Sequence, residues 1–275
     1  MKEEQLYQIH FTPEVESSTL VIMWNEDVGR LGPAVTDYLV RALSGEEFAQ
    51  IEPTYFFPLG GVAVDNDIAQ FPESRFFCCE EKKLIVFRSN SPRSEWYRFL
   101  DTILEIGQHY CNVKQVFAIG GMIYMGPHTV PRQLLGVSNT KEMRQTLGHY
   151  NITCDLNYDT PQGQRPTLNS YLMWIAKRRS IPSASLWVPI PFYFVELDDP
   201  RAWIKVLQFL NTHINLGLDF AELDEYAKKL NERMAQLRQR SPDIESSIQK
   251  LESNIMLTQV ESEQLASEVY QFLSE

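Results

Sequence analysis

The feature that most constrains the fold is a short apolar run near the middle of the chain, followed at once by two glycines. Val116–Ile119 is uniformly apolar, and a run this short and unbroken is typical of a strand buried on both faces. Gly120 and Gly121 then permit positive φ and close backbone approach, so we expect the strand to open there into a loop that continues to Pro131. In α/β proteins ligands bind beyond the carboxyl ends of strands, so a site is expected in this loop.

Further strands alternate with helices before and after this run. Thr19–Trp24 and Ser185–Val188 have the same apolar character. The spacing of apolar residues in Ser94–Tyr110 indicates a helix with one inner face. Arg75–Cys79 and Leu84–Arg88 flank a charged turn, which predicts a β-hairpin. The alternation predicts a largely parallel sheet covered by helices on both sides, that is, a three-layer α/β/α core.

The pattern changes after residue 218. Asp219–Gln239 carries apolar residues at three- and four-residue spacings, and a second long helix is predicted from Ile244 to Phe272 by a heptad-like seam. The chain is therefore expected to contain an α/β core domain over residues 1–218 and a C-terminal helical extension over residues 219–275. We expect this helical hairpin to have coiled-coil character and to pack on a partner or a neighbouring subunit.

Charge and composition exclude several classes of function. The formal net charge is -11, which disfavours nucleic acid held by phosphate contacts and attraction to an anionic membrane. No signal peptide is expected, because the charged N-terminus is not followed by an apolar segment. The most apolar long stretch is interrupted by Pro189 and Pro191 and is shorter than the roughly 18 apolar residues of a membrane span. These features predict a cytoplasmic protein with no membrane partner.

Cysteine and motif patterns predict neither a metal nor a cofactor. The four cysteines contain no C-x-x-C pair, so we expect reduced, mostly buried thiols. The chain lacks the H-E-x-x-H, G-x-x-x-x-G-K-[ST], G-x-G-x-x-G and G-x-S-x-G motifs. No metal site and no bound nucleotide cofactor is therefore expected.

Two groups of polar residues follow predicted strands and are the candidate site. His128 lies between Pro127 and Thr129, and its pKa range suits proton transfer, which makes it the candidate catalytic residue. The alternative is a histidine hydrogen-bonded inside a rigid, proline-bounded turn. A carboxylate turn after the first strand can bind a cation or a sugar hydroxyl, or it can simply be solvated. The candidate ligand-binding residues are Asn25, Asp27, Gly120, Gly121, His128 and Thr129.

An ordered set of segments resembles the proteasome assembly chaperone two family. The resemblance covers the chain from about Thr19 to Leu223, and its most specific part is the glycine pair followed by the proline-bounded His-Thr turn. Val130 stands where arginine often follows that His-Thr pair. The matching segments are Trp24–Gly29, Ser91-Pro92 with Trp96, Gly120-Gly121 with Pro127–Pro131, Tyr158–Gly163 and Ala184–Tyr193.

This resemblance implies a core similar to the phosphorylase/hydrolase-like fold, a C-terminal helical extension and oligomers, with a homotrimer favoured. Relatives in archaea and eukaryotes act on proteasome subunits or assembled proteasomes. We therefore expect a non-catalytic homo-oligomeric scaffold or assembly-chaperone-like protein that binds itself and another protein. The alternative is an enzyme of hydrolase or carboxylate-amine ligase type that acts on a small anionic or nucleoside-like ligand. In that case His128 is the acid/base, and Asn25 and Asp27 position the substrate.

Overall fold

The structure, a computed structural model, describes residues 6–57, 63–65, 67–154, 156 and 159–274. The chain forms two compact units. The first unit consists of residues 1–26, 36–119 and 135–186. The second unit consists of residues 27–35, 120–134 and 187–275.

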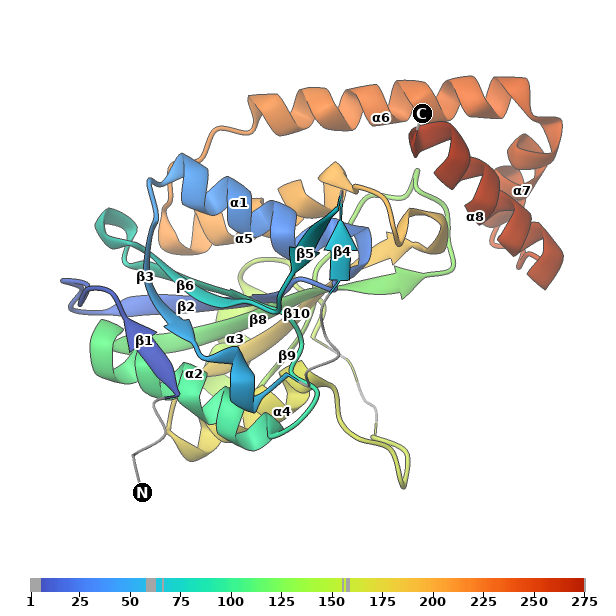
Figure 1. Ribbon diagram of the computed structural model, residues 1–275. Helices are drawn as coiled ribbons and strands as arrows, with labels where there is room; N and C mark the ends of the chain where they lie inside the picture. Colours follow the sequence, from blue (N-terminus) through green and yellow to red (C-terminus); the bar gives the residue numbers. More distant parts are fainter. Residues whose placement is uncertain (1–5, 58–62, 66, 155, 157–158, 275) are drawn as a thin grey trace. The chain divides into compact units, whose positions relative to one another are not determined.

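Strands and helices alternate through most of the chain (Figure 1). The strands are β1 (Tyr7–Ile9), β2 (Ser18–Trp24), β3 (Glu46–Ile51), β4 (Ala63–Asp65), β5 (Ile68–Gln70), β6 (Ser74–Cys79), β7 (Leu84–Ser89), β8 (Val113–Tyr124), β9 (Leu135–Ser138) and β10 (Ser183–Pro191). The α-helices are α1 (Leu31–Ala42), α2 (Trp96–Cys111), α3 (Lys141–Gly148), α4 (Leu168–Arg178), α5 (Pro200–Ile214), α6 (Ala221–Arg240), α7 (Pro242–Glu252) and α8 (Gln259–Ser274). Two short 3-10 helices matter below, η1 (Val28–Arg30) and η4 (Phe192–Phe194).

Eight of the strands form one mixed sheet in the order β1-β3-β6-β7-β2-β8-β10-β9. β2 lies parallel to both β7 and β8, and Ile22 pairs with Phe87 on one side and with Ala118 on the other. β6 and β7 form the predicted antiparallel hairpin. β3 is antiparallel to β6, and β1 is antiparallel to β3. The expectation of a largely parallel sheet is therefore wrong for the edge formed by β1, β3, β6 and β7, where each neighbouring pair is antiparallel.

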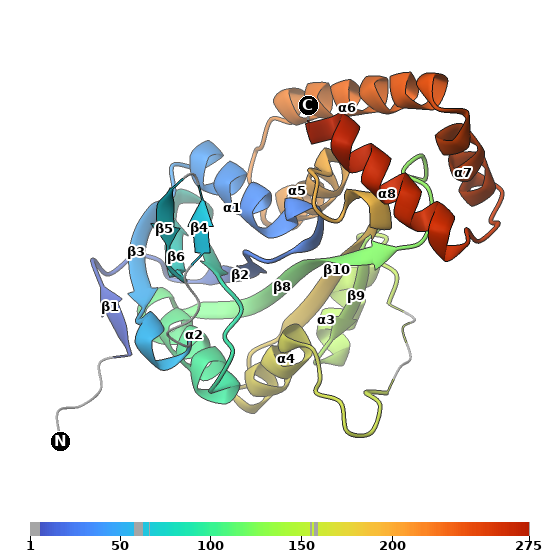
Figure 2. The same ribbon diagram turned by 45° about the vertical axis from the view of Figure 1, so that its right-hand side comes forward.

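One face of the sheet is covered by α2 and α4, which lie side by side in Figures 1 and 2. Alternate residues of β2, such as Leu20 and Ile22, point into this layer because side chains alternate across a strand. They are fully buried with residues of α2 and α4 such as Phe99, Ile103 and Leu172. This layer is the main apolar core of the first unit.

The other face of the sheet is covered in the first unit by residues 36–42 of α1 (Figures 1 and 2). Val21 and Met23, which alternate with Leu20 and Ile22, are completely buried. The Thr36 hydroxyl lies 4.0 Å from the Met23 sulfur, which joins α1 to β2. Helices on both faces of the sheet confirm the predicted three-layer α/β/α architecture.

The C-terminal helices of the second unit differ in one respect from the predicted hairpin. α6 agrees closely with the helix predicted over Asp219–Gln239. The second long helix, in contrast, is two helices, α7 and α8, separated by residues 253–258. Asn254 stops α7 by adopting a left-handed conformation with φ 57°. Ile255, which the heptad pattern placed on the inner seam, is consequently 54% exposed.

Charged side chains hold α6, α7 and α8 together. Arg238 of α6 donates to Glu245 and Glu252 of α7, with Nε–Oε2 and Nη1–Oε1 distances of 2.5 and 2.9 Å. Lys250 of α7 pairs with Glu261 of α8. Arg233 of α6 donates to carbonyl groups in the last turn of α8, where a cation also suits the helix dipole. None of the described helices is long and apolar enough to cross a membrane.

Candidate functional site

Asp27 and Gly121, two of the candidate ligand-binding residues, meet in the second unit. Both carboxylate oxygens of Asp27 accept from the Gly121 backbone N–H, at 2.9 and 3.0 Å. One of them also accepts from the Val28 N–H and so caps η1. Burial raises the pKa of Asp27 to about 6, against the opposing effect of the two backbone N–H groups. The role of the Asp27 carboxylate is therefore to accept hydrogen bonds from the nearby backbone.

The glycine pair does not end the central strand, which corrects the prediction. β8 continues through Gly120 and Gly121 to Tyr124, and neither glycine has a positive φ. Gly121 is instead required by close packing, since a Cβ atom there would lie 2.3 Å from Cγ2 of Val28 and 2.9 Å from its carbonyl oxygen. η1 thus approaches the strand backbone more closely than any side chain would allow.

His128 lies in the interior of the second unit, with only 6% of its surface exposed. The Tyr193 hydroxyl accepts from the His128 backbone N–H at 2.6 Å and lies 2.8 Å from the ring Nδ1. The rings of Tyr193 and Phe194 pack against the imidazole, at centroid distances of 5.9 and 5.7 Å. Burial and the neighbouring Arg201 lower the pKa of His128 to about 4, so the ring is neutral at neutral pH.

An ion pair fixes the end of the same loop. Arg132 contacts the Asp199 carboxylate with both Nε and Nη2 at 2.8 Å, and both side chains are almost completely buried. The other Asp199 oxygen accepts from the Ala202 N–H and caps α5. Arg132 also donates to the Val130 carbonyl at 3.0 Å, and Arg201 donates to the His128 carbonyl at 3.0 Å. We call His128, Arg132, Tyr193 and Asp199 the loop lock.

The remaining predicted site residues do not join this cluster. The Asn25 amide donates to Asn90 at 3.1 Å within the first unit, and Asn90 in turn donates to Glu26. Thr129 is exposed, and its hydroxyl donates to Glu252 at the end of α7 at 3.1 Å. Among the described residues there is no group of three or more His, Cys, Asp or Glu side chains that can hold a metal ion.

Sequence reasoning missed three of the four members of the loop lock. Arg132 had no visible partner, because Asp199 is 67 residues away in the chain. Asp199-Pro200 does carry a signal for the start of a helix, an N-cap followed by proline at the first helical position. Tyr193 lies in an aromatic segment that gave no sign of a hydrogen bond to the distant turn.

Four large apolar side chains at the end of β8 and in the loop after it are exposed. Met122, Ile123, Met125 and Val130 are 41%, 54%, 62% and 40% exposed, and we call them the apolar loop face. A second exposed apolar set follows α7, only a few residues after the Glu252 carboxylate that Thr129 contacts. It consists of Ile255, Met256 and Val260. Where exposed apolar side chains form a contiguous patch, they mark interaction surfaces.

Chemically, the site is a loop whose buried polar groups bond to one another and which exposes several large apolar side chains. It belongs to a mixed-sheet α/β protein with helices on both sides and additional C-terminal helices. The model of the PAC2 family matches residues 25–238, so the chain belongs to the PAC2 family. The resemblance drawn from the short motifs is thereby confirmed. No curated protein matches the sequence.

Solved structures show the same fold. A protein of unknown function from Mycobacterium tuberculosis is 18% identical with a TM-score of 0.75, covering 92% of each chain. The proteasome-assembly chaperone homologue of Mycobacterium tuberculosis is 16% identical with a TM-score of 0.66, covering 79% of this chain and 94% of its own. PbaB of Pyrococcus furiosus, an archaeal proteasome activator, is 16% identical with a TM-score of 0.66, covering 84% and 97%. At these sequence identities the similarity to the solved structures shows a shared fold and nothing more.

Proposed function

We propose that this protein is a non-catalytic, homo-oligomeric scaffold of the assembly-chaperone type, with a trimer as the favoured oligomer and a second protein as its partner. One contrast within the loop carries the proposal. The polar groups at Asp27, His128 and Arg132 are bonded within the second unit, whereas Ile123 and Met125 are more than half exposed. A loop of this kind is suited to bind protein surface and offers little to a polar substrate.

Family membership supports the same proposal. Two structures with this fold are described as a proteasome-assembly chaperone homologue and a proteasome activator. Both descriptions concern action on another protein assembly. By analogy, the partners we propose are subunits of a large cytoplasmic protein complex, and the apolar loop face is the surface we propose for contact between copies of this chain. The C-terminal extension, residues 219–275, is proposed as a second contact region because Ile255, Met256 and Val260 are exposed there.

Light scattering on the purified chain at micromolar concentration tests the oligomer. The wild-type chain is expected to be an oligomer, and Ile123→Glu combined with Met125→Glu is expected to yield monomer, because buried unpaired charges oppose association. Ile68→Glu is the matched control, since Ile68 is 63% exposed on β5 in the first unit. A wild-type chain that is only monomeric, with no co-purifying protein, would contradict the proposal.

The enzymatic alternative has a separate test. A thermal-shift screen with nucleotides and small carboxylates is expected to leave the melting temperature unchanged. The buried, hydrogen-bonded position of the His128 ring supports this expectation. A ligand that raises the melting temperature of the wild-type chain, but not of His128→Ala, would favour the enzyme and overturn the scaffold.

A further inference from the structure

Four aromatic side chains form a strip along α2 and α4 in the first unit. Trp96 of α2 and Tyr171 of α4 have ring centroids 6.5 Å apart. Tyr171 stacks on Trp174 one turn later, at 5.4 Å and an interplanar angle of 7°. The Tyr97 ring meets the edge of Trp174 at 6.2 Å. Tyr97 and Trp174 are 43% and 46% exposed, whereas Tyr171 is partly buried against the core of the first unit, so the aromatic strip lies at the surface of that core.

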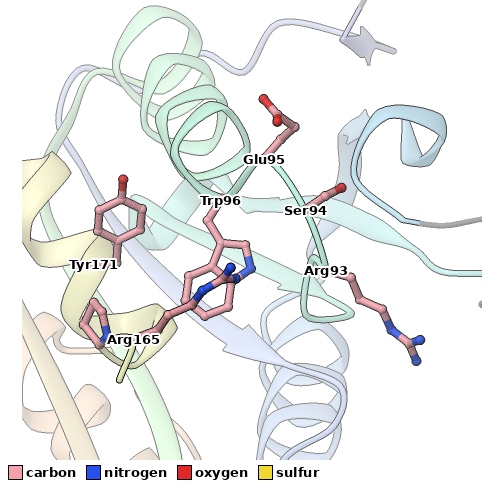
Figure 3. A pocket seen from close by; sticks show the side chains of 7 residues that line it. Arg93, Ser94, Glu95, Trp96, Arg165 and Tyr171 are labelled. Atoms are coloured by element: carbon pink, nitrogen blue, oxygen red, sulfur yellow. The ribbon is translucent and has the colours of Figure 1, made fainter. Parts of the chain in front are cut away.

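A cavity of about 420 Å³ opens at the Trp96 end of the aromatic strip (Figure 3). The rings of Trp96, Tyr171 and Pro166 give it apolar walls, and Arg93 and Arg165 are polar members of its lining. The Trp96 indole N–H donates to the Pro92 carbonyl at 2.7 Å, which fixes the ring orientation. The remaining lining residues are Ser94 and Glu95. The cavity is therefore an apolar cleft with charged groups beside it.

Arginine side chains lie at both ends of the aromatic strip. Arg93 and Arg165 line the cavity, and the Arg178 guanidinium lies over the Trp174 ring at 5.1 Å. Within the described part of the chain, none of these three arginines forms an ion pair with a carboxylate. Among the described residues that line the cavity, Glu95 is the one carboxylate. This local excess of positive charge contrasts with a net charge of -11 for the chain.

We propose that the aromatic strip binds an extended, proline-rich segment of a partner protein that carries acidic side chains. Proline-rich segments adopt the polyproline-II conformation and dock on grooves lined by aromatic rings. That helix has three residues per turn, so an acidic residue at every third position forms a row along one edge. Proline rings then pack on Trp96, Tyr171 and Trp174, and the acidic row pairs with the guanidinium groups.

Single-stranded nucleic acid is the other ligand that aromatic and arginine side chains commonly bind. The number of cations favours the acidic peptide. Three arginines are fewer than the phosphate contacts on which nucleic-acid binding usually depends, whereas they can pair with the few carboxylates of a short acidic segment.

Fluorescence anisotropy with a labelled peptide tests the proposal on the full-length chain. The probe is a Pro-Pro-Glu repeat of about 12 residues, which spans roughly four turns. It is expected to bind, and to bind at least about tenfold more weakly to Trp174→Ala and to the double variant Arg93→Gln with Arg165→Gln, because aromatic and arginine anchors dominate such interfaces. The controls are Phe71→Ala, which removes an aromatic ring 65% exposed elsewhere in the first unit, and Lys114→Gln, which removes an exposed cation.

Three results would overturn the proposal. One is equal binding of a Pro-Pro-Lys repeat, another is tighter binding of an oligothymidine of similar length, and the third is wild-type affinity in both strip variants. The proposed oligomer lies outside this test, because Trp174→Ala leaves the apolar loop face intact. Loss of peptide binding with an unchanged oligomer thus separates the two proposals.

Discussion

The loop lock of the second unit and the aromatic strip of the first unit contain similar side chains in opposite circumstances. In the loop lock, Arg132 and Asp199 are almost completely buried and paired at 2.8 Å, and His128 is enclosed by aromatic rings. In the aromatic strip, Tyr97 and Trp174 are nearly half exposed, and the arginines lack carboxylate partners in the described residues. The first arrangement determines the path of a loop, and the second remains available to a ligand.

This contrast shows that the type of a side chain does not by itself determine its role. A histidine, an arginine and an aspartate near the end of a central strand suggest catalysis, yet here their hydrogen bonds hold η4, α5 and the loop together. Buried polar groups of this kind need all their partners. Mutations in the loop lock should therefore change stability, whereas mutations in the aromatic strip should change binding.

The largest expected effect is on the buried ion pair. Arg132→Ala leaves the Asp199 carboxylate buried without its counter-charge, which should lower the free energy of unfolding by about 3–5 kcal/mol. Urea unfolding followed by circular dichroism measures this loss. Arg75→Ala is the control, because Arg75 forms a pair with Glu73 at 2.6 Å that is exposed on both sides and should contribute about 1 kcal/mol or less. Equal losses in the two variants would refute the assigned role.

A smaller effect concerns the pH dependence of stability. The pKa of His128 is lowered from 6.5 to about 4 in the folded chain. Between these pH values the histidine binds a proton in the unfolded chain but not in the folded chain. The stability that the buried, neutral His128 contributes is therefore lost as pH falls from about 6.5 to 4. The loss is at most about 1.4 kcal/mol per pH unit.

His128→Asn should remove this contribution while keeping a hydrogen-bond acceptor for Tyr193. Asp27, whose pKa is raised to about 6, has the opposite dependence, since its stabilisation is lost as pH rises from about 4 to 6. The quantity to measure is therefore the difference in slope between the wild-type chain and His128→Asn in urea titrations from pH 4 to 7. Identical slopes, or an imidazole that titrates near pH 6.5 by NMR, would show that His128 is accessible to solvent.

Gly121→Ala should have the next largest effect. The new Cβ would lie 2.3 Å from Cγ2 of Val28, and overpacking of this kind costs about 1–3 kcal/mol. Gly148→Ala is the matched control, since nothing lies within 4 Å of its Cβ position in α3, and alanine in place of glycine there should be neutral or stabilising by up to about 1 kcal/mol. Thermal unfolding of both variants compares them directly. A Gly121→Ala chain as stable as the wild type would mean that η1 can move away from β8.

Local sequence signals were sufficient for much of the fold. The apolar runs and helical spacings located β2, β7, β10 and α2. The sequence also contains a signal for the break between α7 and α8, because Thr258 and Glu261 have the spacing of a capping box. In the structure each of these side chains accepts a hydrogen bond from the other residue's backbone N–H, at 2.8 and 3.3 Å. The heptad pattern outweighed that signal in the prediction. β1 could not be found from its own three residues, since its pairing with β3 defines it.

The candidate site was harder to predict than the fold. The sequence indicated the loop and His128, whereas the hydrogen bond between Asp27 and Gly121 became visible only in the structure. It gave no means of pairing His128 with Tyr193, 65 residues away, or of recognising that burial shifts the histidine pKa downward. Tyr158, part of one predicted motif, lies outside the described residues. The aromatic strip is formed by residues of two helices that are far apart in the sequence. The sequence shows each aromatic residue, but it does not show that Trp96 of α2 packs near Tyr171 of α4.

The smallest expected change in stability is in the aromatic strip itself. Trp174 is 46% exposed, so Trp174→Ala removes mainly its stacking on Tyr171, worth about 0.5–1.5 kcal/mol. The urea midpoint should therefore shift far less than it does for Arg132→Ala, while peptide affinity falls about tenfold. A loss of stability as large as that of Arg132→Ala would place Trp174 in the structural framework. The two regions would then no longer differ in role, because the side chains of both would serve mainly to stabilise the folded chain.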